Sequence, residues 1–510
     1  MRTACLALIL VTLGASPCLA ACGGHATPPP TPAASTATTS GSPLPTASSD
    51  QTFNVRDFGA RGDGTSDDTA ALRRALVHAA RVGGAVYLPT GTYFCATTVK
   101  LPDGVRVGGD GQSSWLQGRL IFGSHDVVSR LKIGRLGQCA VTNSAGATDT
   151  TFVDCRLHGG GSTSDENSSV LYLGGLEGNV SGITFLRCRI ERTSYVPPAG
   201  VNAYRNGVGN TITIHEFCYL PHSGHVEHIA FRDCYLGASN GHASGALRMV
   251  MEAFTWDNRT GRVYHGWKDL VFQGCTVAAG DTTGLDFADN QLPSGAHSAS
   301  EVLIDGCTFL GAAADRSSGF GGLPIVYECP TGIVITHNTF YAAPHEAIGG
   351  SHVGQGTTAA PGLLIQGNTF DMTRSPVGLT HETGSACIKL VGYKSRIQGN
   401  TFVYRAGLGV VIEADKAPAV GNTVAGNTFT DLRASGGEPT VELTSQQGQS
   451  CSQNHITGNT ITNRAAGGAG VIAQIGGGPN FATGNVIDAG TATPFVGPPG
   501  KLVHAGNQVT

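Results

Sequence analysis

The sequence predicts an all-β solenoid, a fold of short stacked coils, because one pattern recurs along most of the chain. Eleven segments place a Cys or Asn between a strand residue and a β-branched or apolar residue, from TFVDCRL to ATGNVID. From Cys155 to Asn485 is 330 residues in ten steps, a mean period of 33. Such a repeat buries its apolar face only by stacking on the next copy. The ladder positions are Cys155, Cys188, Cys234, Cys275, Cys307, Asn338, Asn368, Asn400, Asn427, Asn459 and Asn485.

Composition agrees with this fold class and narrows the partners. Only 13% of the residues are charged and 74 of 510 are Gly, which suits a body rich in strands and turns. The formal net charge is −4, so the chain has no overall basic footprint and we expect no nucleic-acid partner. No CxxC spacing supports a zinc site, and no metal ligand is predicted.

The N-terminus reads as an export and anchoring segment. Residues 1–21 contain one basic residue followed by an apolar stretch, as in a secretory signal. They end in Leu-Ala-Ala-Cys-Gly, which resembles a bacterial lipobox and implies that Cys22 is lipidated; ordinary cleavage after Ala20 or Ala21 is the alternative. Residues 22–50 are rich in Pro, Thr and Ser and predict a disordered tether. We therefore expect an extracellular protein, anchored to the outer face of the cytoplasmic membrane only through its lipid.

The segment FNVRDFGARGDGTSDDTAALRRALVHAARVGGAVYLPTGTYF, residues 53–94, predicts one helix followed by a strand. The helix spans about residues 67–82, with Asp67 or Asp68 as its cap and Gly83-Gly84 at its end. Its apolar face is predicted to contain Leu72, Ala75, Leu76, Ala79 and Ala80.

Residues 53–110 resemble the N-terminal module of the pectate-lyase superfamily, in the branch of polygalacturonases, rhamnogalacturonases and phage tailspikes. The resemblance implies that residues 51–510 form one right-handed parallel β-helix whose open end the helix covers. A bare end would expose apolar core and unpaired strand edges.

The ladder residues are expected to be structural. Cys at this position would stack as small buried filler, and stacked Asn amides would bond to one another. Asn also tolerates the left-handed backbone of a sharp turn. Disulfides remain open for the cysteines outside the ladder, which are Cys95, Cys139, Cys218, Cys329, Cys387 and Cys451.

A second series of short strands lies between the ladder positions and predicts the functional face. Alternation turns Leu285 and Phe287 into the core and Asp286 outward. The predicted outward row contains His215, Glu252, Asp286, Glu328, Lys389, Glu413 and Glu442.

The predicted catalytic group is a set of carboxylates from neighbouring coils, with Asp286 the residue most expected to be essential. Adjacent coils would place them about 5 Å apart and next-but-one coils about 10 Å apart, as acid and partner carboxylates require. Crowding would keep one of them protonated as a general acid. GLDFADN resembles a stretch of β-helix carbohydrate-active proteins whose first Asp faces the cleft. The set is Asp281, Asp286, Asp289, Glu252 and Glu328. No cofactor is expected, although the same oxygens would suit a calcium ion.

Three functions remain open at this point. The first is cleavage of a polysaccharide by a glycoside hydrolase. The second is a lyase or epimerase, for which Ala343-Pro344-His345-Glu346 is similar to the DPHE motif of alginate epimerases, with Ala343 where those enzymes carry Asp. The third is a glycan-binding protein without catalysis. Residues predicted to bind substrate are His215, Arg248, Trp256, His352 and Lys389.

Overall fold

The computed structural model describes most of the chain from residue 51 onward. The described residues are 51–160, 169–175, 178–192, 211–217, 223–238, 247–252, 267–278, 283–287, 299–310, 323–327, 332–341, 346–350, 362–373, 386–405, 407–415, 417–433, 438–446 and 448–510. These residues belong to one compact unit, Ser49–Thr510. The predicted signal, Cys22 and the tether lie outside the described residues.

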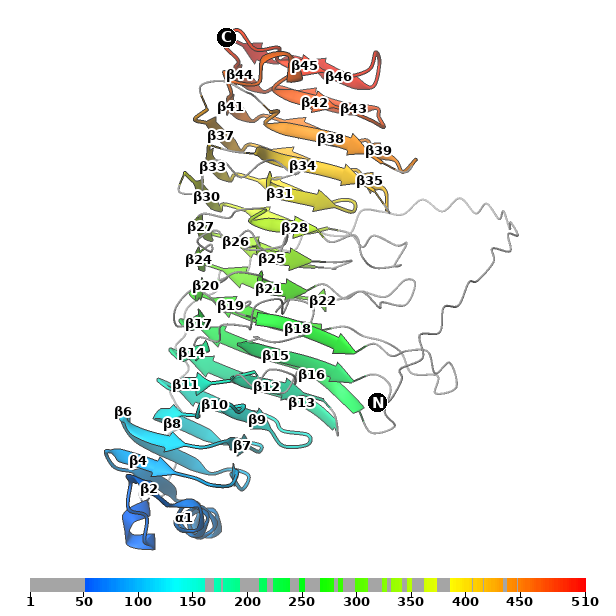
Figure 1. Ribbon diagram of the computed structural model, residues 1–510. Helices are drawn as coiled ribbons and strands as arrows, with labels where there is room; N and C mark the ends of the chain where they lie inside the picture. Colours follow the sequence, from blue (N-terminus) through cyan, green and yellow to red (C-terminus); the bar gives the residue numbers. More distant parts are fainter. Residues whose placement is uncertain are drawn as a thin grey trace, which may run out of the picture. The chain divides into compact units, whose positions relative to one another are not determined.

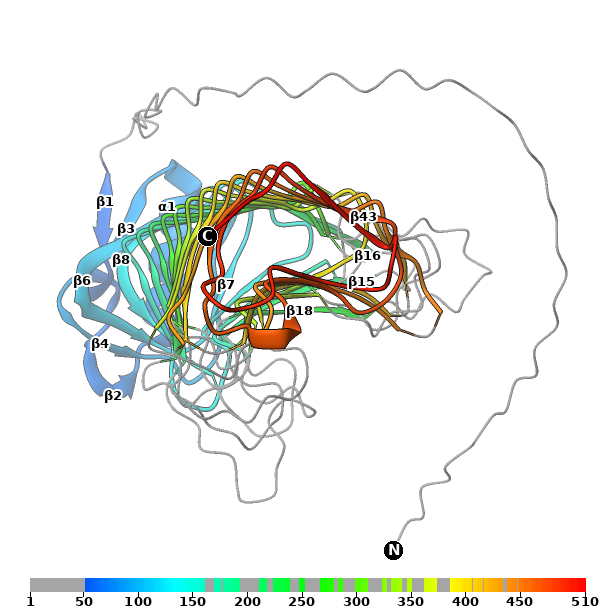
Figure 2. The ribbon, with the colours of Figure 1, turned by 90° about the horizontal axis from the view of Figure 1, so that it is seen from above.

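The described part is a parallel β-helix with a single α-helix, as predicted, and two short 3-10 helices, η1 (Val55–Phe58) and η3 (Gly467–Ala469). Every strand pairing is parallel, and most strands pair with their counterparts in the coils before and after (Figure 1); β35 (Ala419–Val420) and β39 (Cys451–Ser452) form a separate two-stranded sheet. Seen along the stack, β15 (Ile212–Phe217) and β18 (Leu247–Glu252) face β16 (Ser223–Arg232) and β43 (Asn480–Thr483) across the interior (Figure 2).

Two large sheets form the walls. The 14-stranded sheet consists of β5 (Val99–Lys100), β7 (Leu120–Phe122), β9 (Val141–Asn143), β12 (Leu171–Gly174), β15, β18, β21 (Thr283–Phe287), β25 (Leu323–Tyr327), β28 (Ile348–Gly350), β31 (Ala386–Val391), β34 (Leu408–Ala414), β38 (Val441–Ser445), β42 (Ile472–Gln474) and β45 (Phe495–Val496). The 31-stranded sheet begins with β1 (Thr52–Asn54), β2 (Asp63–Asp67), β3 (Ala85–Leu88), β4 (Gly91–Phe94), β6 (Arg106–Gln117) and β8 (Val127–Ile133).

The rest of the 31-stranded sheet is a double row, with one strand on each side of every ladder residue. The strands before the ladder are β10 (Thr151–Val153), β13 (Gly178–Leu186), β16, β19 (Trp267–Gln273), β22 (Ala299–Ser300), β23 (Leu303–Asp305), β26 (Val334–Thr336), β29 (Leu364–Gln366), β32 (Arg396–Gln398), β36 (Thr423–Ala425), β40 (His455–Thr457), β43 and β46 (Leu502–Ala505). Those after it are β11 (Arg156–Gly159), β14 (Arg189–Arg192), β17 (Tyr235–Ala238), β20 (Thr276–Ala278), β24 (Thr308–Leu310), β27 (Thr339–Tyr341), β30 (Thr369–Met372), β33 (Thr401–Tyr404), β37 (Thr428–Asp431), β41 (Thr460–Thr462), β44 (Val486–Asp488) and β47 (Gln508–Val509).

The helix α1 (Thr69–Val82) covers the first coil and begins two residues later than predicted. Asp68 is the N-cap residue, but its carboxylate accepts hydrogen bonds from the backbone of Arg61 and Gly62. Asp67 accepts from the backbone N–H of Thr69 instead, at 3.0 Å. The buried face contains Ala71 in place of the predicted Ala80, which is exposed. Gly83 ends the helix in the left-handed conformation, as predicted.

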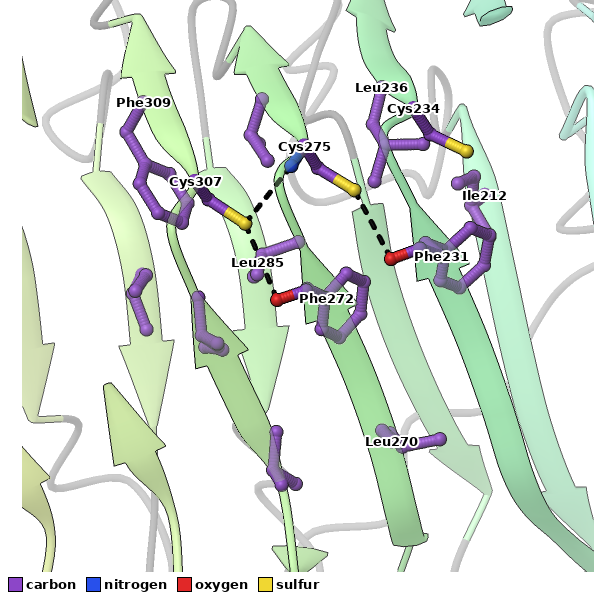
Figure 3. Packing of buried hydrophobic residues seen from close by; sticks show 14 of the residues in the cluster. Ile212, Phe231, Cys234, Leu236, Leu270, Phe272, Cys275, Leu285, Cys307 and Phe309 are labelled. Carbon is purple, nitrogen blue, oxygen red and sulfur yellow. Dashed lines mark hydrogen bonds between the residues drawn. The ribbon is translucent and has the colours of Figure 1, made fainter. Parts of the chain in front are cut away.

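The ladder residues stack in the interior, as the repeat predicted. In the first half, each Cys sulfur lies against backbone of a neighbouring coil, as for Cys275 and Cys307 (Figure 3). The described cysteines are all free and buried, including Cys95, Cys139, Cys387 and Cys451. In the second half, Asn side chains bond from coil to coil at 2.8–3.0 Å.

The prediction that the ladder Asn adopts the left-handed backbone conformation was wrong by one position. The residue before the ladder position takes the positive φ, for example Asp154 at 53° and Gly399 at 63°. The Asn therefore serves through the hydrogen bonds of its amide. Gly commonly precedes it because the turn requires a positive φ at that residue.

Candidate functional site: the outer face of the 14-stranded sheet

The alternation predicted for the 14-stranded sheet is confirmed where the structure describes side chains. Leu285, Phe287, Ile325 and Tyr327 lie in the core, as do the four equivalent residues of later coils. Those four are Ile388, Leu390, Val441 and Leu443. Residues between them in sequence therefore belong to the opposite, outer face of the sheet.

Asp286 lies between two core residues but is not solvated as predicted. Its exposed fraction is only 5%. The strand register places Arg248 of β18 directly opposite it on one side and Val326 of β25 on the other. A carboxylate at so closed a position requires compensating polar or charged neighbours.

The predicted convergence of Glu252 with Asp286 does not agree with this register. Glu252 stands four residues beyond Arg248 and pairs in register with Phe217 of β15. Four strand residues correspond to about 13 Å along the sheet. The turns between coils differ in length and shift the strands along one another. Glu252, the last residue of β18, therefore does not stand opposite Asp286 of β21.

Most of the other predicted site residues lie outside the described residues or are described by their backbone alone. Only the backbone positions of Glu252, His215 and Arg248 are described. The candidates outside the described residues are Asp281, Asp289, Glu328, Trp256 and His352. The His345 considered for a lyase or epimerase also lies outside them.

Lys389 is the one predicted substrate-binding residue whose side chain is described. Its Nζ lies 2.8 Å from Oε2 of Glu413, with exposed fractions of 22% and 10%. Gln446 donates to the other oxygen, Oε1, of Glu413 at 2.7 Å. Both oxygens of Glu413 are thus engaged, and Lys389 is held with its charge partly open to solvent.

Glu442 completes a charged group with Lys389 and Glu413; the two glutamates were assigned to the outward row but not selected as site residues. Lys389, Val411 and Glu442 stand side by side on β31, β34 and β38, so the outer two are about 10 Å apart. Burial, then Glu438 and Glu413, raises the pKa of the Glu442 carboxyl. The sequence did contain a signal for this group, because two outward Glu residues follow Lys389 within the next two coils.

Because the folded state binds this proton more tightly, the pH dependence has a defined sign. Stability from Glu442 is present below the ordinary pKa of 4.5 and declines as pH rises through the higher folded value. We therefore expect Glu442→Gln to flatten the decline in unfolding free energy between weakly acid and neutral pH. Urea unfolding across that range measures it, and the exposed Glu301→Gln is the control. Parallel curves for Glu442→Gln and the parent would contradict the expectation.

A buried tyrosine supports the strand that carries Lys389. The Tyr327 hydroxyl accepts a hydrogen bond from Val391 N–H at 3.0 Å and lies 3.3 Å from the Lys389 carbonyl oxygen, to which it donates. The Tyr327 hydroxyl lies beside Gly350, the last residue of β28. A side chain at this position would not fit, because an added Cβ would lie 3.0 Å from the hydroxyl and 2.6 Å from Val391. The Tyr327 hydroxyl therefore supplies hydrogen bonds to the backbone of β31 at the point where the neighbouring strand β28 ends.

Removing that hydroxyl is expected to destabilise the protein by about 1–3 kcal/mol, because Val391 N–H loses its acceptor in the interior. The variant Tyr327→Phe keeps the ring and its packing. Chemical unfolding monitored by far-UV circular dichroism measures the loss. An unchanged midpoint would show that water or a shifted strand replaces the hydroxyl.

No metal site can be assigned from the structure. The described residues contain no group of three His, Cys, Asp or Glu side chains suited to an ion. Three carboxylates considered for calcium, Asp281, Asp289 and Glu328, lie outside that part of the chain. In the same part, no helix is long and apolar enough to cross a membrane.

Comparison with known proteins defines the class. Residues 52–157 match the family described as rhamnogalacturonase A/epimerase, pectate lyase-like, and residues 268–446 match the right-handed β-helix region. The chain is therefore a right-handed parallel β-helix protein with a pectate lyase-like N-terminal region, and the expected resemblance is confirmed.

Individual relatives share limited segments with it. Mannuronan C5-epimerase AlgE1 of Azotobacter vinelandii is 33% identical over 150 residues, which are 28% of this chain and 10% of that protein. Alginate lyase 7 of the same organism is 45% identical over 56 residues, 11% of this chain and 6% of the lyase. The chain thus spans at most a tenth of either protein. The surface adhesin PfbA of Streptococcus pneumoniae has a TM-score of 0.43 and 14% identity, with 90% of each chain covered.

Proposed function

We propose that this protein is an extracellular enzyme that acts on a uronate-containing polysaccharide, as a lyase or epimerase, on the outer face of its 14-stranded sheet. The observation that carries the proposal is the register of Arg248 with Asp286 in adjacent coils. Lys389 belongs to the same row, three strands further along. Acid and cation positions in one row suit a chain that carries carboxylates better than a neutral one.

Both reactions begin when a base takes the proton from the carbon next to the uronate carboxylate, a role for which His345 and His352 remain candidates. A lyase then breaks the bond between the next carbon and the glycosidic oxygen, whereas an epimerase returns a proton to the opposite face of the same carbon. The negative charge that develops must be stabilised by a fixed cation or hydrogen-bond donor. We assign this role to Arg248. Asp286 is assigned to the same sugar, where it orients the cation or accepts a substrate hydroxyl. Lys389 is about 14 Å from Asp286 along the row, and we assign it to the carboxylate of a sugar further along the polysaccharide.

The names of the relatives support uronates as the substrate class. Mannuronan and alginate are the polymers named for the two Azotobacter proteins. The predicted secretory segment and Cys22 support an extracellular location with a lipid anchor, which mass spectrometry of the mature N-terminus would test. His215, Trp256 and His352 remain proposed substrate contacts.

Glycoside hydrolysis is the second candidate, and Glu442 is the observation that favours it. A carboxyl whose pKa is raised retains its proton nearer neutral pH and can act as a general acid. Asp281, Asp289, Glu252 and Glu328 remain candidates for the same chemistry.

A substrate panel distinguishes these functions. The purified protein is incubated with polymannuronate, polygalacturonate and a neutral glucan. A lyase produces unsaturated ends that absorb in the ultraviolet, a hydrolase produces reducing ends without that absorbance, and an epimerase changes only the proton NMR spectrum. We expect the first or third result on a uronate polymer. Activity on the neutral glucan alone, or binding with no product, would overturn the proposal.

A further inference from the structure

A row of aromatic and basic residues crosses neighbouring strands of the 31-stranded sheet. Trp115, Lys132, Arg156, Arg189 and Tyr235 stand opposite one another in five successive coils. These strands, β6, β8, β11, β14 and β17, are labelled along one edge of Figure 1. The row spans four strand spacings, about 19 Å. We call these five residues the basic row.

One buried carboxylate fixes the two guanidinium groups of the basic row. Glu191 is only 1% exposed, and its two oxygens each accept from one arginine. Arg156 Nε lies 2.5 Å from Oε1, and Arg189 Nε lies 2.5 Å from Oε2. The side chains of the two arginines remain 29% and 43% exposed, and Arg156 Nη1 also donates to Gln112 Oε1 at 2.9 Å, so both orientations are set at the protein surface. Such preorganisation lowers the entropy cost of binding an anion.

The two aromatic rings hold cations of the same row. Lys132 Nζ lies 3.5 Å from the centroid of Trp115, and Arg189 Cζ lies 3.9 Å from that of Tyr235. Trp115 is itself fixed by a hydrogen bond from Nε1 to the Gly134 carbonyl oxygen at 2.9 Å. One face of each ring is therefore covered, which disfavours the base stacking that single-stranded nucleic acids use.

The row carries three cations against one carboxylate, within a chain of net charge −4. Burial, and then the Arg156 guanidinium, lowers the pKa of Lys132. His158, opposite Glu191, has its pKa lowered by burial, Lys132 and Arg156, and so adds little charge near neutral pH. An anionic ligand would relieve this repulsion.

We propose that the basic row is a second binding surface, for an extended anionic polysaccharide whose carboxylates contact Lys132, Arg156 and Arg189. Three cations at successive strand spacings match a linear polymer with charges repeated along its length. The surface lies on a different sheet from Asp286, so it would hold or guide a polymer without taking part in catalysis. The inference does not depend on the enzymatic proposal.

Protection of Lys132 from acetylation tests this surface directly. Polygalacturonate fragments are added to the full chain carrying Asp286→Asn, which disables the proposed catalytic site, and acetylation is followed by mass spectrometry. We expect at least about threefold slower acetylation of Lys132 at saturation, with no change at the exposed Lys501 of the last coil. Equal protection of both lysines, or none at Lys132, would overturn the proposal.

Variants then test charge and geometry. Lys132→Gln is expected to weaken polygalacturonate binding about three- to tenfold, and the matched Lys501→Gln to leave it unchanged. Arg189→Lys keeps the charge but loses the planar fork, so it should also weaken binding. A neutral glucan or single-stranded oligo-dT that protects Lys132 better than the uronate would contradict the assigned ligand. Unaltered affinity in Lys132→Gln would do the same.

Discussion

Replacing Asp286 with Asn is expected to lower the rate on the uronate substrate by at least about 100-fold, the range lost with a group that moves or orients protons. The two side chains have nearly the same volume, so the packing of Leu285 and Phe287 beneath it should persist. The charge opposite Arg248 is what the substitution removes. Initial rates of product formation on the polymer identified by the substrate panel measure the effect.

Asp233→Asn is the matched control. Asp233 is exposed in the turn beside the ladder, with a φ of 54°, a conformation that Asn accepts readily. It should therefore retain parental activity and stability. If Asp286→Asn retains activity as well, the reaction takes place on other coils, and the Lys389 and Glu442 group becomes the first alternative. A loss of activity that only parallels a loss of folded protein would equally remove Asp286 from the site.

The architecture could be predicted because its causes are local and repeated. A ladder residue recurs in each coil from Cys155 to Asn485, and the alternation of Leu285, Asp286 and Phe287 follows from strand geometry alone. The covering helix was also predictable, since its apolar face and terminal Gly83 are encoded within one short segment. These features do not depend on the lengths of the turns between coils.

The neighbours of Asp286 could not be predicted, because they depend on those lengths. Arg248 and Asp286 are 38 residues apart, Asp286 and Val326 are 40, and Val326 and Gly349 only 23, against a mean ladder period of 33. Each difference shifts which outer residues meet. Alternation likewise fixes the side on which Asp286 lies but not its exposure, which was predicted as solvated and is 5%.

The same limit explains why the basic row was absent from the predicted sites. The low overall charge argued against a basic surface, yet stacking gathers Lys132, Arg156 and Arg189 from segments that are separated in sequence. Their strand-to-strand register and the ion pairs of Glu191 with both arginines are properties of the coils together. Charge counted over the chain therefore says little about charge on one face of a solenoid.

Replacing Asn400 with Leu in the ladder is expected to cost about 3–5 kcal/mol of unfolding free energy, through several buried groups left without partners. The Asn400 amide donates to the Ile365 carbonyl oxygen and to Asn427 Oδ1, both at 2.9 Å. Its Oδ1 accepts from the backbone and side-chain nitrogens of Asn368, at 2.8 and 3.0 Å. Leu has similar volume but satisfies none of these groups.

Two further variants separate hydrogen bonding from packing. Asn400→Cys should cost less than Leu, because sulfur is a weak acceptor at the ladder position, where Cys307 Sγ accepts from the Cys275 backbone N–H. The adjacent, exposed Thr401→Ala should stay within about 0.5 kcal/mol of the parent. Denaturant unfolding of all three gives the order. Equal losses for Leu and Cys would mean that the amide bonds contribute little beyond filling space, and that the Asn and Cys halves of the ladder are stabilised by packing alone.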